Sequence, residues 1–385
     1  MSKDVKTLIA KTFEEIAHGL ETGNFGSIPK IAVLGVGSEH GEQNMLAGAA
    51  AAADRGANPV FIGSLKQDDI ASSFANNEEN AVRVMEEGLK SGEFAAAVAM
   101  HYPFPIGTST VGRVITPGAG RSMFIATTTG TSATDRVAGM VKNAIYGIIC
   151  AKACGIKKPT VGILNIDGAR QAERALKELA TNGYTIKFAT SLRGDGGNIL
   201  RGNDILTGAC DILVCDPLTG NVLMKMLSFY TTGGDYEAAG YGYGPGISMD
   251  AKELVLIVSR ASGAPVVAGA VEYAAQLVRG DWKSVAKAEF AAAKAAGLDD
   301  ILRKIEEKAA PVAKEVIAAP PKEVVTGEVS GIEITDLDDA VNGLWKAGIY
   351  AESGMGCTGP VVLVNENRLD AAREILVKGG WISNE

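Results

Sequence analysis

The sequence is poor in histidine and cysteine, and this shortage excludes several kinds of site. It has three histidines and five cysteines in 385 residues, and no CxxC or His/Cys cluster has the spacing of a zinc site. An odd, sparse set of cysteines does not form a disulfide framework. We therefore expect no metal, no tightly bound cofactor and few candidates for histidine-based catalysis.

Long apolar runs and a surplus of positive charge are also missing. No apolar run reaches membrane-spanning length without interruption, and Met1 to Lys6 lead into a periodic helix and not into the apolar core of a signal peptide. The net charge of -8 argues against nucleic acid as the main partner, although a local site can still bind a small anion. We expect a cytoplasmic protein with neither a membrane nor a nucleic-acid partner.

The chain itself is rich in strand-like and helix-like segments that alternate. Strand-like runs lie at 30–35, 59–63, 95–100, 123–126, 160–165, 211–215 and 265–268, and helical patterns lie at 41–55, 78–91, 137–153 and 169–182. Strands that alternate with helices of this length predict an α/β fold. In this fold a mostly parallel sheet is covered by helices on both faces.

Composition divides the chain into four parts. They are an N-terminal helix (1–25), a main α/β domain (26–308), a proline-containing linker (309–330) and a C-terminal unit (331–385). Pro311 and Pro320 stand among charged residues in the linker, where proline breaks both helix and sheet. The C-terminal unit combines helices from Leu337 and Arg368 with a strand at 361–364. Because it is small, we expect it to pack on the main domain.

Cys357 stands out in the C-terminal unit, within Ser353-Gly354-Met355-Gly356-Cys357-Thr358-Gly359-Pro360. The glycines allow a tight turn and a close approach to a ligand, which predicts that the thiol lies on a loop. Backbone N–H groups around a thiolate lower its pKa and favour a nucleophile. The alternative is a small buried cysteine in a structural turn. The remaining cysteines are expected to be core thiols: Cys150, Cys154, Cys210 and Cys215.

Several loops have the composition of anion sites. The segment from Gly35 to Gly41 follows a strand and opens a helix, whose N-terminal N–H groups attract anions. It matches neither the Walker A nor the dinucleotide pattern, so a plain turn is the alternative. The loop from Arg193 to Asn198 adds a cation to a flexible polar segment.

The segment from Asp204 to Lys225 has a stronger signal. A strand ends at Asp216, a turn at 218–221 opens a helix, and Lys225 lies one helical turn further on. Polar groups at the carboxyl end of a parallel strand face the usual ligand crevice of α/β proteins. Lys225 is therefore a candidate cation there, with an exposed helix lysine as the alternative.

This segment resembles the phosphate acyltransferases of phospholipid synthesis. In that family an aspartate, a Thr-Gly-Asn-Val turn and a lysine follow one another, as Asp216, residues 219–222 and Lys225 do here. The segment Leu164-Asn165-Ile166-Asp167-Gly168 resembles the family's Leu-Asn-Ile-Gly region. The resemblance covers roughly residues 30–280 and implies a fold related to isopropylmalate dehydrogenases, with an acyl group and phosphate as ligands. The segment around Cys357 is not part of this pattern.

The full chain resembles a narrower family, the acetyl-phosphate-forming alpha subunits of component C of glycine, sarcosine and betaine reductases. The resemblance includes Val258-Ser259-Arg260-Ala261-Ser262-Gly263-Ala264-Pro265 and the segment from Gly354 to Pro360. In that family the cysteine of the second motif carries an acetyl thioester. This role maps onto Cys357.

The resemblance implies that inorganic phosphate is a substrate, which attacks the thioester and releases acetyl phosphate. It implies two partners, the component C beta subunit and a selenoprotein A that bears a carboxymethyl group, and an oligomeric assembly. Oxyanion candidates are Gly356, Thr358 and Gly359, and phosphate-binding candidates are Arg193, Asn198, Asn221 and Lys225.

Two other functions stay open. A phosphate acyltransferase that acts directly on acyl-CoA or acyl carrier protein would need no covalent intermediate. A non-enzymatic scaffold would only dock the selenoprotein. A dehydrogenase is disfavoured, because the sequence has no nicotinamide-binding fingerprint.

Overall fold

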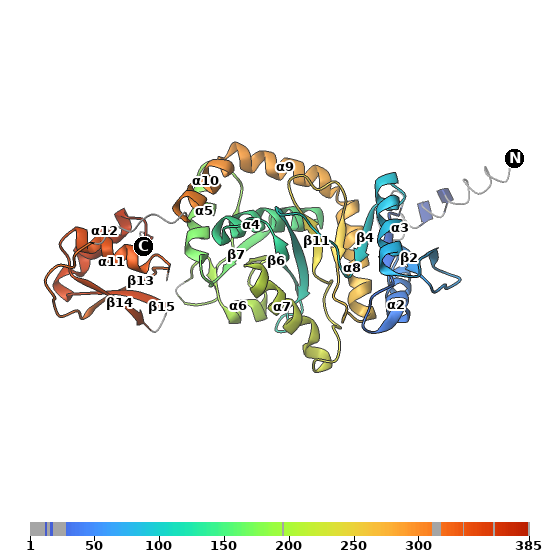
Figure 1. Cartoon of the computed structure of the whole chain (residues 1–385), viewed down its shortest axis with the longest axis horizontal. Coiled ribbons are helices and arrows are strands. Elements are labelled where there is room, and N and C mark those ends of the chain that lie inside the picture. Colours follow the sequence, from blue (N-terminus) through green and yellow to red (C-terminus); the bar gives the residue numbers. More distant parts are fainter. Residues whose placement is uncertain are drawn as a thin grey trace.

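The computed structural model describes residues 12–13, 16–17, 28–194, 196–309, 317–333, 335–356 and 359–383. Residues 28–309 form the main body, and residues 317–383 form the C-terminal unit. Figure 1 shows the C-terminal unit at one end of the molecule, beside helix α5 (Ala169–Thr181). Within the described residues, no helix is both long and apolar enough to cross a membrane.

A twelve-stranded sheet runs through the main body. Its strands are β1 (Lys30–Leu34), β2 (Asn58–Gly63), β3 (Ala71–Phe74), β4 (Ala96–Ala99), β5 (Thr108–Ile115), β6 (Ser122–Thr131), β7 (Thr160–Leu164), β8 (Lys187–Phe188), β9 (Ile199–Leu200), β10 (Ile212–Val214), β11 (Gly244–Ile247) and β12 (Val255–Ile257). Their order is β3-β2-β1-β4-β12-β11-β5-β6-β10-β7-β8, and β9 also pairs with β7. Antiparallel pairing is confined to the centre, where β11 pairs with β12 and β5, and β5 pairs with β6.

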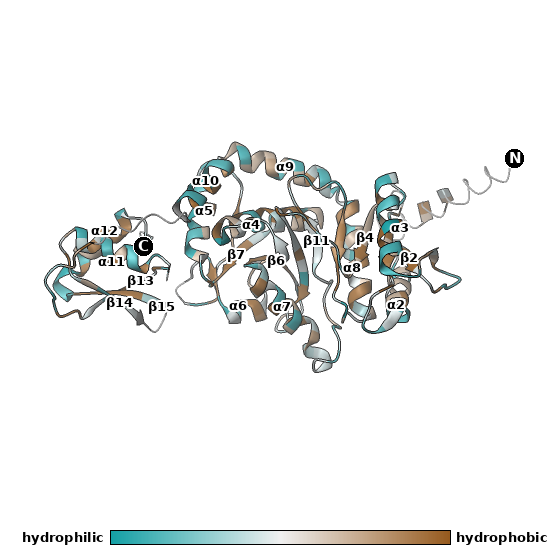
Figure 2. Ribbon diagram, in the orientation of Figure 1, coloured by the Kyte–Doolittle hydropathy of each residue, from teal (hydrophilic) through white to brown (hydrophobic). Residues whose placement is uncertain are grey.

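Helices cover both faces of this sheet. They are α2 (Gly41–Ala53), α3 (Glu78–Ser91), α4 (Arg136–Ala153), α5, α6 (Gly202–Thr207), α7 (Pro217–Phe229), α8 (Ala264–Arg279), α9 (Trp282–Ala295) and α10 (Leu298–Ala309). Because side chains alternate along a strand, Ile31 and Val33 of β1 join the core under α2, α4 and α8, while Ala32 and Leu34 join the core under α3 and α7. Figure 2 shows hydrophobic residues on strands of the sheet, such as β4 and β7, and on helix α8. The predicted α/β fold, with a mostly parallel sheet between helical layers, is confirmed.

The antiparallel centre makes the two halves of the sheet run in opposite directions. Between β12 and β10 the strand direction reverses at β12–β11, β11–β5 and β5–β6, while β6 and β10 are parallel. The carboxyl ends of β4 and β12 therefore lie at one edge of the sheet, and those of β6, β10 and β7 lie at the opposite edge. Strand spacing along the sequence does not reveal this reversal.

One predicted strand is wrong. Residues 265–268 belong to α8 and not to the sheet, because α8 is buried on nearly all sides and its apolar run looks like a buried strand. Pro265 stands at the start of the helix, where its missing N–H costs nothing. The strand in this region is the short β12, and we did not predict it or β5 from the sequence.

The C-terminal unit has a core of its own. Strands β13 (Gly327–Ser330), β14 (Ala351–Gly356) and β15 (Gly359–Val364) form an antiparallel sheet in the order β13-β15-β14, which is covered by α11 (Leu337–Lys346) and α12 (Leu369–Lys378). Residues 327–330, which we assigned to the linker, pair with β15 and extend this sheet.

The described residues on either side of Cys357 lie in strands, and the position of the thiol on a loop stays a prediction. Residues up to Gly356 lie in β14, those from Gly359 lie in β15, and these two glycines face each other in the ladder. Cys357 and Thr358 lie outside the described residues.

Polar contacts join the C-terminal unit to the N-terminal end of α5. The Arg170 N–H donates to the Glu333 carboxylate at 2.5 Å, and Asp336 accepts from the side chains of Gln171 at 2.7 Å and Arg174 at 3.3 Å. Glu333 is buried, and this burial outweighs the hydrogen bonds that its carboxylate accepts at the N-terminus of α5, so the pKa of Glu333 is raised.

A candidate anion site at the carboxyl end of β12

Helix α7 begins with a well-defined cap and lies close to β6. Asp216 accepts hydrogen bonds from the N–H groups of Leu218 and Thr219, both at 3.0 Å, and Pro217 follows as the first helical residue. A side chain at Gly220 would collide with the Thr127 carbonyl oxygen. Residues 218–221, which we expected to form a turn, are therefore the first turn of a helix pressed against β6.

Asn221 holds this helix in place. Its side-chain N–H donates to the Thr128 carbonyl at 3.3 Å, and the Thr128 hydroxyl donates to the Tyr243 carbonyl at 2.7 Å. The side-chain amide of Asn221 thus contacts the protein backbone. This contact gives Asn221 a structural role beside its candidate role in phosphate binding.

Lys225 lies at the opposite edge of the sheet from the one we predicted. It is the ninth residue of α7, and a helix rises about 1.5 Å per residue, so α7 has run back across the sheet by this point. The Lys225 ammonium donates to the Ser259 hydroxyl at 2.7 Å, just beyond the carboxyl end of β12. Lys225 therefore lies at the carboxyl end of β12 and not at the carboxyl end of β10.

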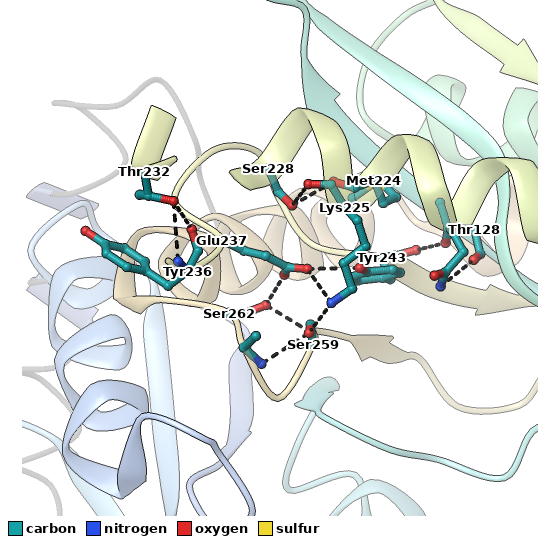
Figure 3. A network of polar contacts seen from close by, with 12 residues as sticks. Thr128, Met224, Lys225, Ser228, Thr232, Tyr236, Glu237, Tyr243, Ser259 and Ser262 are labelled. Carbon is teal, nitrogen blue, oxygen red and sulfur yellow. Dashed lines mark hydrogen bonds and ion pairs between the residues drawn. The ribbon is translucent and has the colours of Figure 1, made fainter. Parts of the chain in front are cut away.

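A buried carboxylate holds Lys225 there (Figure 3). Glu237 is fully buried and forms an ion pair with Lys225 at 3.0 Å. It accepts the Tyr243 hydroxyl at 2.9 Å and the Ser262 hydroxyl at 2.6 Å. Burial, and then the charge of Glu237, raise the pKa of Tyr243, so the phenol keeps its proton and remains a donor. A charged group this deep in the protein is stable only with partners of this kind.

The cluster keeps two hydrogen-bond donors for a ligand. Lys225 has three N–H groups and uses two, on Glu237 and Ser259. The Ser259 hydroxyl oxygen accepts from Lys225 and from the Ala261 N–H at 3.1 Å, which leaves its own hydrogen to donate. Lys225 is 41% exposed. An ammonium and a hydroxyl donor thus stand side by side at a strand end, as a phosphate or an oxyanion requires.

Arg260 brings a second cation to the same strand end. Its guanidinium donates to Glu78 at 2.6 Å and to the Gly37 carbonyl at 2.7 Å. The hydrogen bond between the two side chains raises the pKa of Arg260 and lowers the pKa of Glu78. The loop from Gly35 to Gly41 therefore lies beside Ser259 and Arg260. Sequence reasoning placed Arg260 in a motif without assigning it to the site, because its neighbours come from distant parts of the sequence.

The other two phosphate candidates lie elsewhere, in the loop between β8 and β9. The Asn198 side chain donates to the Ala189 carbonyl at 2.9 Å and closes this loop. The Arg193 N–H donates to the Ser191 hydroxyl at 3.3 Å. Figure 1 shows the loop at the end of the main body that faces the C-terminal unit. Of the four phosphate-binding candidates, Asn221 and Lys225 therefore lie on α7, and Arg193 and Asn198 lie in the loop between β8 and β9.

The four described cysteines are poor nucleophiles. Burial raises the pKa of Cys154 and of Cys210 to about 12, and raises the pKa of Cys150 and Cys215 further. Cys150, Cys210 and Cys215 are buried, as predicted, and Cys154 is partly buried. In the described parts of the chain, no three His, Cys, Asp or Glu side chains come together as a metal site would require.

Two cavities lie away from Lys225. One, of about 530 Å³, lies between α9 and the β11–β12 connection; four lysines line it, with Trp282 and Phe290. The other, of about 370 Å³, lies in the C-terminal unit between α11 and β14, with Trp345 and Glu352 in its wall.

The sequence of this α/β protein is similar to those of phosphate acyltransferases. A family model described as "Fatty acid synthesis protein" matches residues 29–363. A phosphate acyltransferase of Thermus thermophilus is 26% identical over 237 residues, which cover 51% of this chain and 70% of that protein.

The chain belongs to this family and, within it, to the alpha subunits of component C of glycine/sarcosine/betaine reductase complexes. The subunit from Peptoclostridium acidaminophilum is 55% identical over 383 residues, which cover 99% of this chain and all of that one. A branched-chain phosphotransacylase from Enterococcus faecalis V583 is 15% identical, with a TM-score of 0.43, and covers 64% of this chain and 99% of its own.

Proposed function

We propose that this chain forms acetyl phosphate by attack of inorganic phosphate on an acetyl thioester at Cys357. The observation that carries the proposal is the 55% identity to a component C alpha subunit, which extends over the C-terminal unit as well as the main body. By its name, that relative is part of an amino-acid reductase complex.

The proposed step balances without a further reactant. A phosphate oxygen bonds to the acetyl carbonyl carbon, and the tetrahedral intermediate expels the Cys357 sulfur with the electrons of the C–S bond. The thiolate is a good leaving group, and the phosphate proton passes to it or to water. Donors near the carbonyl oxygen stabilise the intermediate, and we assign the backbone N–H group of Thr358 to this role. Gly356 and Gly359, the other two candidates, pair with each other in the ladder on either side of it, and their N–H groups are used there.

The cluster at the end of β12 supports a phosphate site in this reaction. The free N–H of Lys225 and the Ser259 hydroxyl come from atoms 2.7 Å apart, so both can reach the same phosphate group. Arg260 follows directly in the chain. We retain Arg193 and Asn198 as candidates for a second contact, because their loop faces the C-terminal unit.

The proposed reaction requires the thioester at Cys357 to come into contact with the phosphate that is bound near Lys225. The contacts described above for the C-terminal unit, at Glu333 and Asp336, are with α5 and not with Lys225 or Ser259. The unit has a separate core, and its contacts with α5 are polar. In our proposal the C-terminal unit therefore carries the thioester to the phosphate site.

The same proposal includes the partners. A selenoprotein A delivers the two-carbon unit as a carboxymethyl group, and the component C beta subunit takes part in its conversion to the thioester. The complex named for the Peptoclostridium relative supports an assembly of several components.

A direct phosphate acyltransferase is the second candidate. The observation that favours it is the position of Lys225 and Ser259 in the main body, apart from the described strands that lead to Cys357. In that reaction, phosphate would attack acyl-CoA or an acyl carrier protein at the cluster, with no role for Cys357.

Mass spectrometry of the acylated protein separates the two candidates. The purified chain is incubated with acetyl phosphate, which reverses the proposed step, and its peptides are analysed. An acetyl group on Cys357 that disappears on addition of phosphate supports the thioester. If turnover continues in Cys357→Ser and no adduct forms in the wild type, the direct reaction replaces it.

A further inference from the structure

Glu237 is the most deeply buried charged side chain of the cluster, yet it offers nothing to a ligand. It is fully buried, and one carboxylate oxygen accepts from Lys225 and Tyr243 while the other accepts from Ser262. With its oxygens occupied in this way, Glu237 acts on a ligand only through the groups that it holds (Figure 3).

Those groups are the two donors of the candidate site. Lys225 reaches Ser259 while it is paired with Glu237, and Ser262 belongs to the turn that follows β12. The same turn is fixed by the Ser259 N–H, which donates to the Ser262 hydroxyl at 3.0 Å. The backbone N–H of Glu237 donates to the Ala261 carbonyl at 3.0 Å. The helix lysine and the serine turn are thus fixed to one buried carboxylate.

We propose that Glu237 is a positioning residue, which holds the Lys225 ammonium beside the Ser259 hydroxyl so that both donate to the same anion. This inference rests on the proposed phosphate site. A lysine side chain has many rotamers, and ordering it costs free energy. A partner that orders it before the ligand arrives removes that cost from binding.

The sign of the effect distinguishes positioning from simple electrostatics. Glu237 is negative and lies near the anion site, so its charge alone weakens phosphate binding. Glu237→Gln removes this charge and keeps the size of the side chain. If Glu237 acted only through its charge, phosphate would bind the variant more tightly. If Glu237 positions Lys225, phosphate binds the variant more weakly.

The chain contains a matched control. Glu289 is also buried, forms an ion pair with Lys152 at 2.6 Å and accepts the Tyr184 hydroxyl at 2.9 Å. It has the same kind of partners as Glu237, but it links α9 to α4 and the Tyr184 region. Glu289→Gln therefore measures what the loss of a buried Glu–Lys pair does to the protein in general.

Two measurements on the full chain test the proposal. In isothermal titration with inorganic phosphate, Glu237→Gln should bind phosphate about tenfold or more weakly than the wild type, an effect typical of residues that orient a binding group. Glu289→Gln should bind phosphate as tightly as the wild type. Acetic anhydride labelling, followed by peptide mass spectrometry, should modify Lys225 several times faster in Glu237→Gln than in the wild type.

Three results would overturn the inference. They are unchanged or tighter phosphate binding in Glu237→Gln, equal losses in both variants, and an unchanged rate of Lys225 labelling. If the wild type binds no phosphate, the phosphate site itself is wrong. The labelling rates then still decide whether Glu237 holds Lys225.

Discussion

At the scale of single residues, the chemistry of this protein depends on which polar groups have partners. Lys225, Ser259 and Glu237 come from three separate segments and form one hydrogen-bonded cluster. Lys225 and Ser259 keep one donor each for a ligand, whereas the Glu237 carboxylate is fully buried and both of its oxygens accept from protein groups. This division assigns binding to the first two residues and positioning to the third.

Lys225→Ala should raise the phosphate KM by roughly 10- to 150-fold, since a lost charge-assisted contact costs about 1.5–3 kcal/mol. Steady-state rates against phosphate concentration, at a saturating acetyl donor, measure this effect. Lys152→Ala is the control, because it breaks the comparable pair with Glu289 away from the site. An unaltered phosphate curve in Lys225→Ala would remove Lys225 from the site.

Cys357 should react with iodoacetamide before the other four cysteines. Burial raises the pKa of Cys154 and Cys210 to about 12 and keeps them as thiols near neutral pH, and Cys150 and Cys215 are held further from ionisation. Only the thiolate is nucleophilic. Peptide mapping of the native protein after brief labelling checks this order. Equal labelling of all five would count against a reactive Cys357.

At the scale of secondary structure elements, α7 determines where the candidate cation lies. The helix begins at the carboxyl end of β10, held by the Asp216 cap, and carries Lys225 back to the carboxyl end of β12. Its approach to β6 is close because residue 220 is glycine. The position of Lys225 therefore depends on backbone packing earlier in the same helix.

Gly220→Ala should lower the free energy of unfolding by about 1–3 kcal/mol, because the new methyl group meets the Thr127 carbonyl and α7 must shift. The same shift should raise the phosphate KM. Gly202→Ala is the control at the start of α6, where an added Cβ has no neighbour within 4 Å. Urea denaturation compares the two, and equal stability of both variants would refute the close-packing argument.

At the scale of the whole molecule, the main body and the C-terminal unit have separate cores, and we assign a different step of the proposed reaction to each. The main body holds the candidate phosphate site, and the C-terminal unit holds the hairpin that leads to Cys357. The contacts between them use Glu333 and Asp336 against α5. Polar contacts of this kind depend on pH and salt more than apolar ones do.

Glu333→Gln should raise the melting temperature at pH 7.5, and the gain should shrink as the pH falls towards 5. Burial, with smaller effects from Asp167 and Asp336, raises the folded pKa of Glu333 above its unfolded value of 4.5. Its contribution to stability is therefore fully present below the unfolded pKa and is lost as the pH rises through the folded pKa. Melting curves of both proteins across this range test the sign. A difference that does not change with pH would contradict it.

The sequence alone determined the local and compositional features of this protein. The periodicity of α5, the apolar run of β1 and the strand before Asp216 predict an α/β fold, because each depends on neighbouring residues. Motif resemblance likewise indicated the family, since a motif is a local pattern. Local patterns failed at residues 265–268, which we predicted to be a strand. They belong to an apolar helix that is buried on nearly all sides, and without a polar face its helical period is not visible in the sequence.

Only the tertiary structure decided which distant residues meet. The antiparallel pairs at the centre of the sheet reverse its direction, and this reversal places Lys225 beside Ser259 and not at the end of β10. The partnership of Glu237 with Lys225, and of Arg260 with Gly37 and Glu78, depends on the same geometry. Sheet pairing and helix packing bring together residues as far apart as Gly37 and Arg260, which are separated by 223 positions. The spacing of residues along the sequence does not predict such contacts.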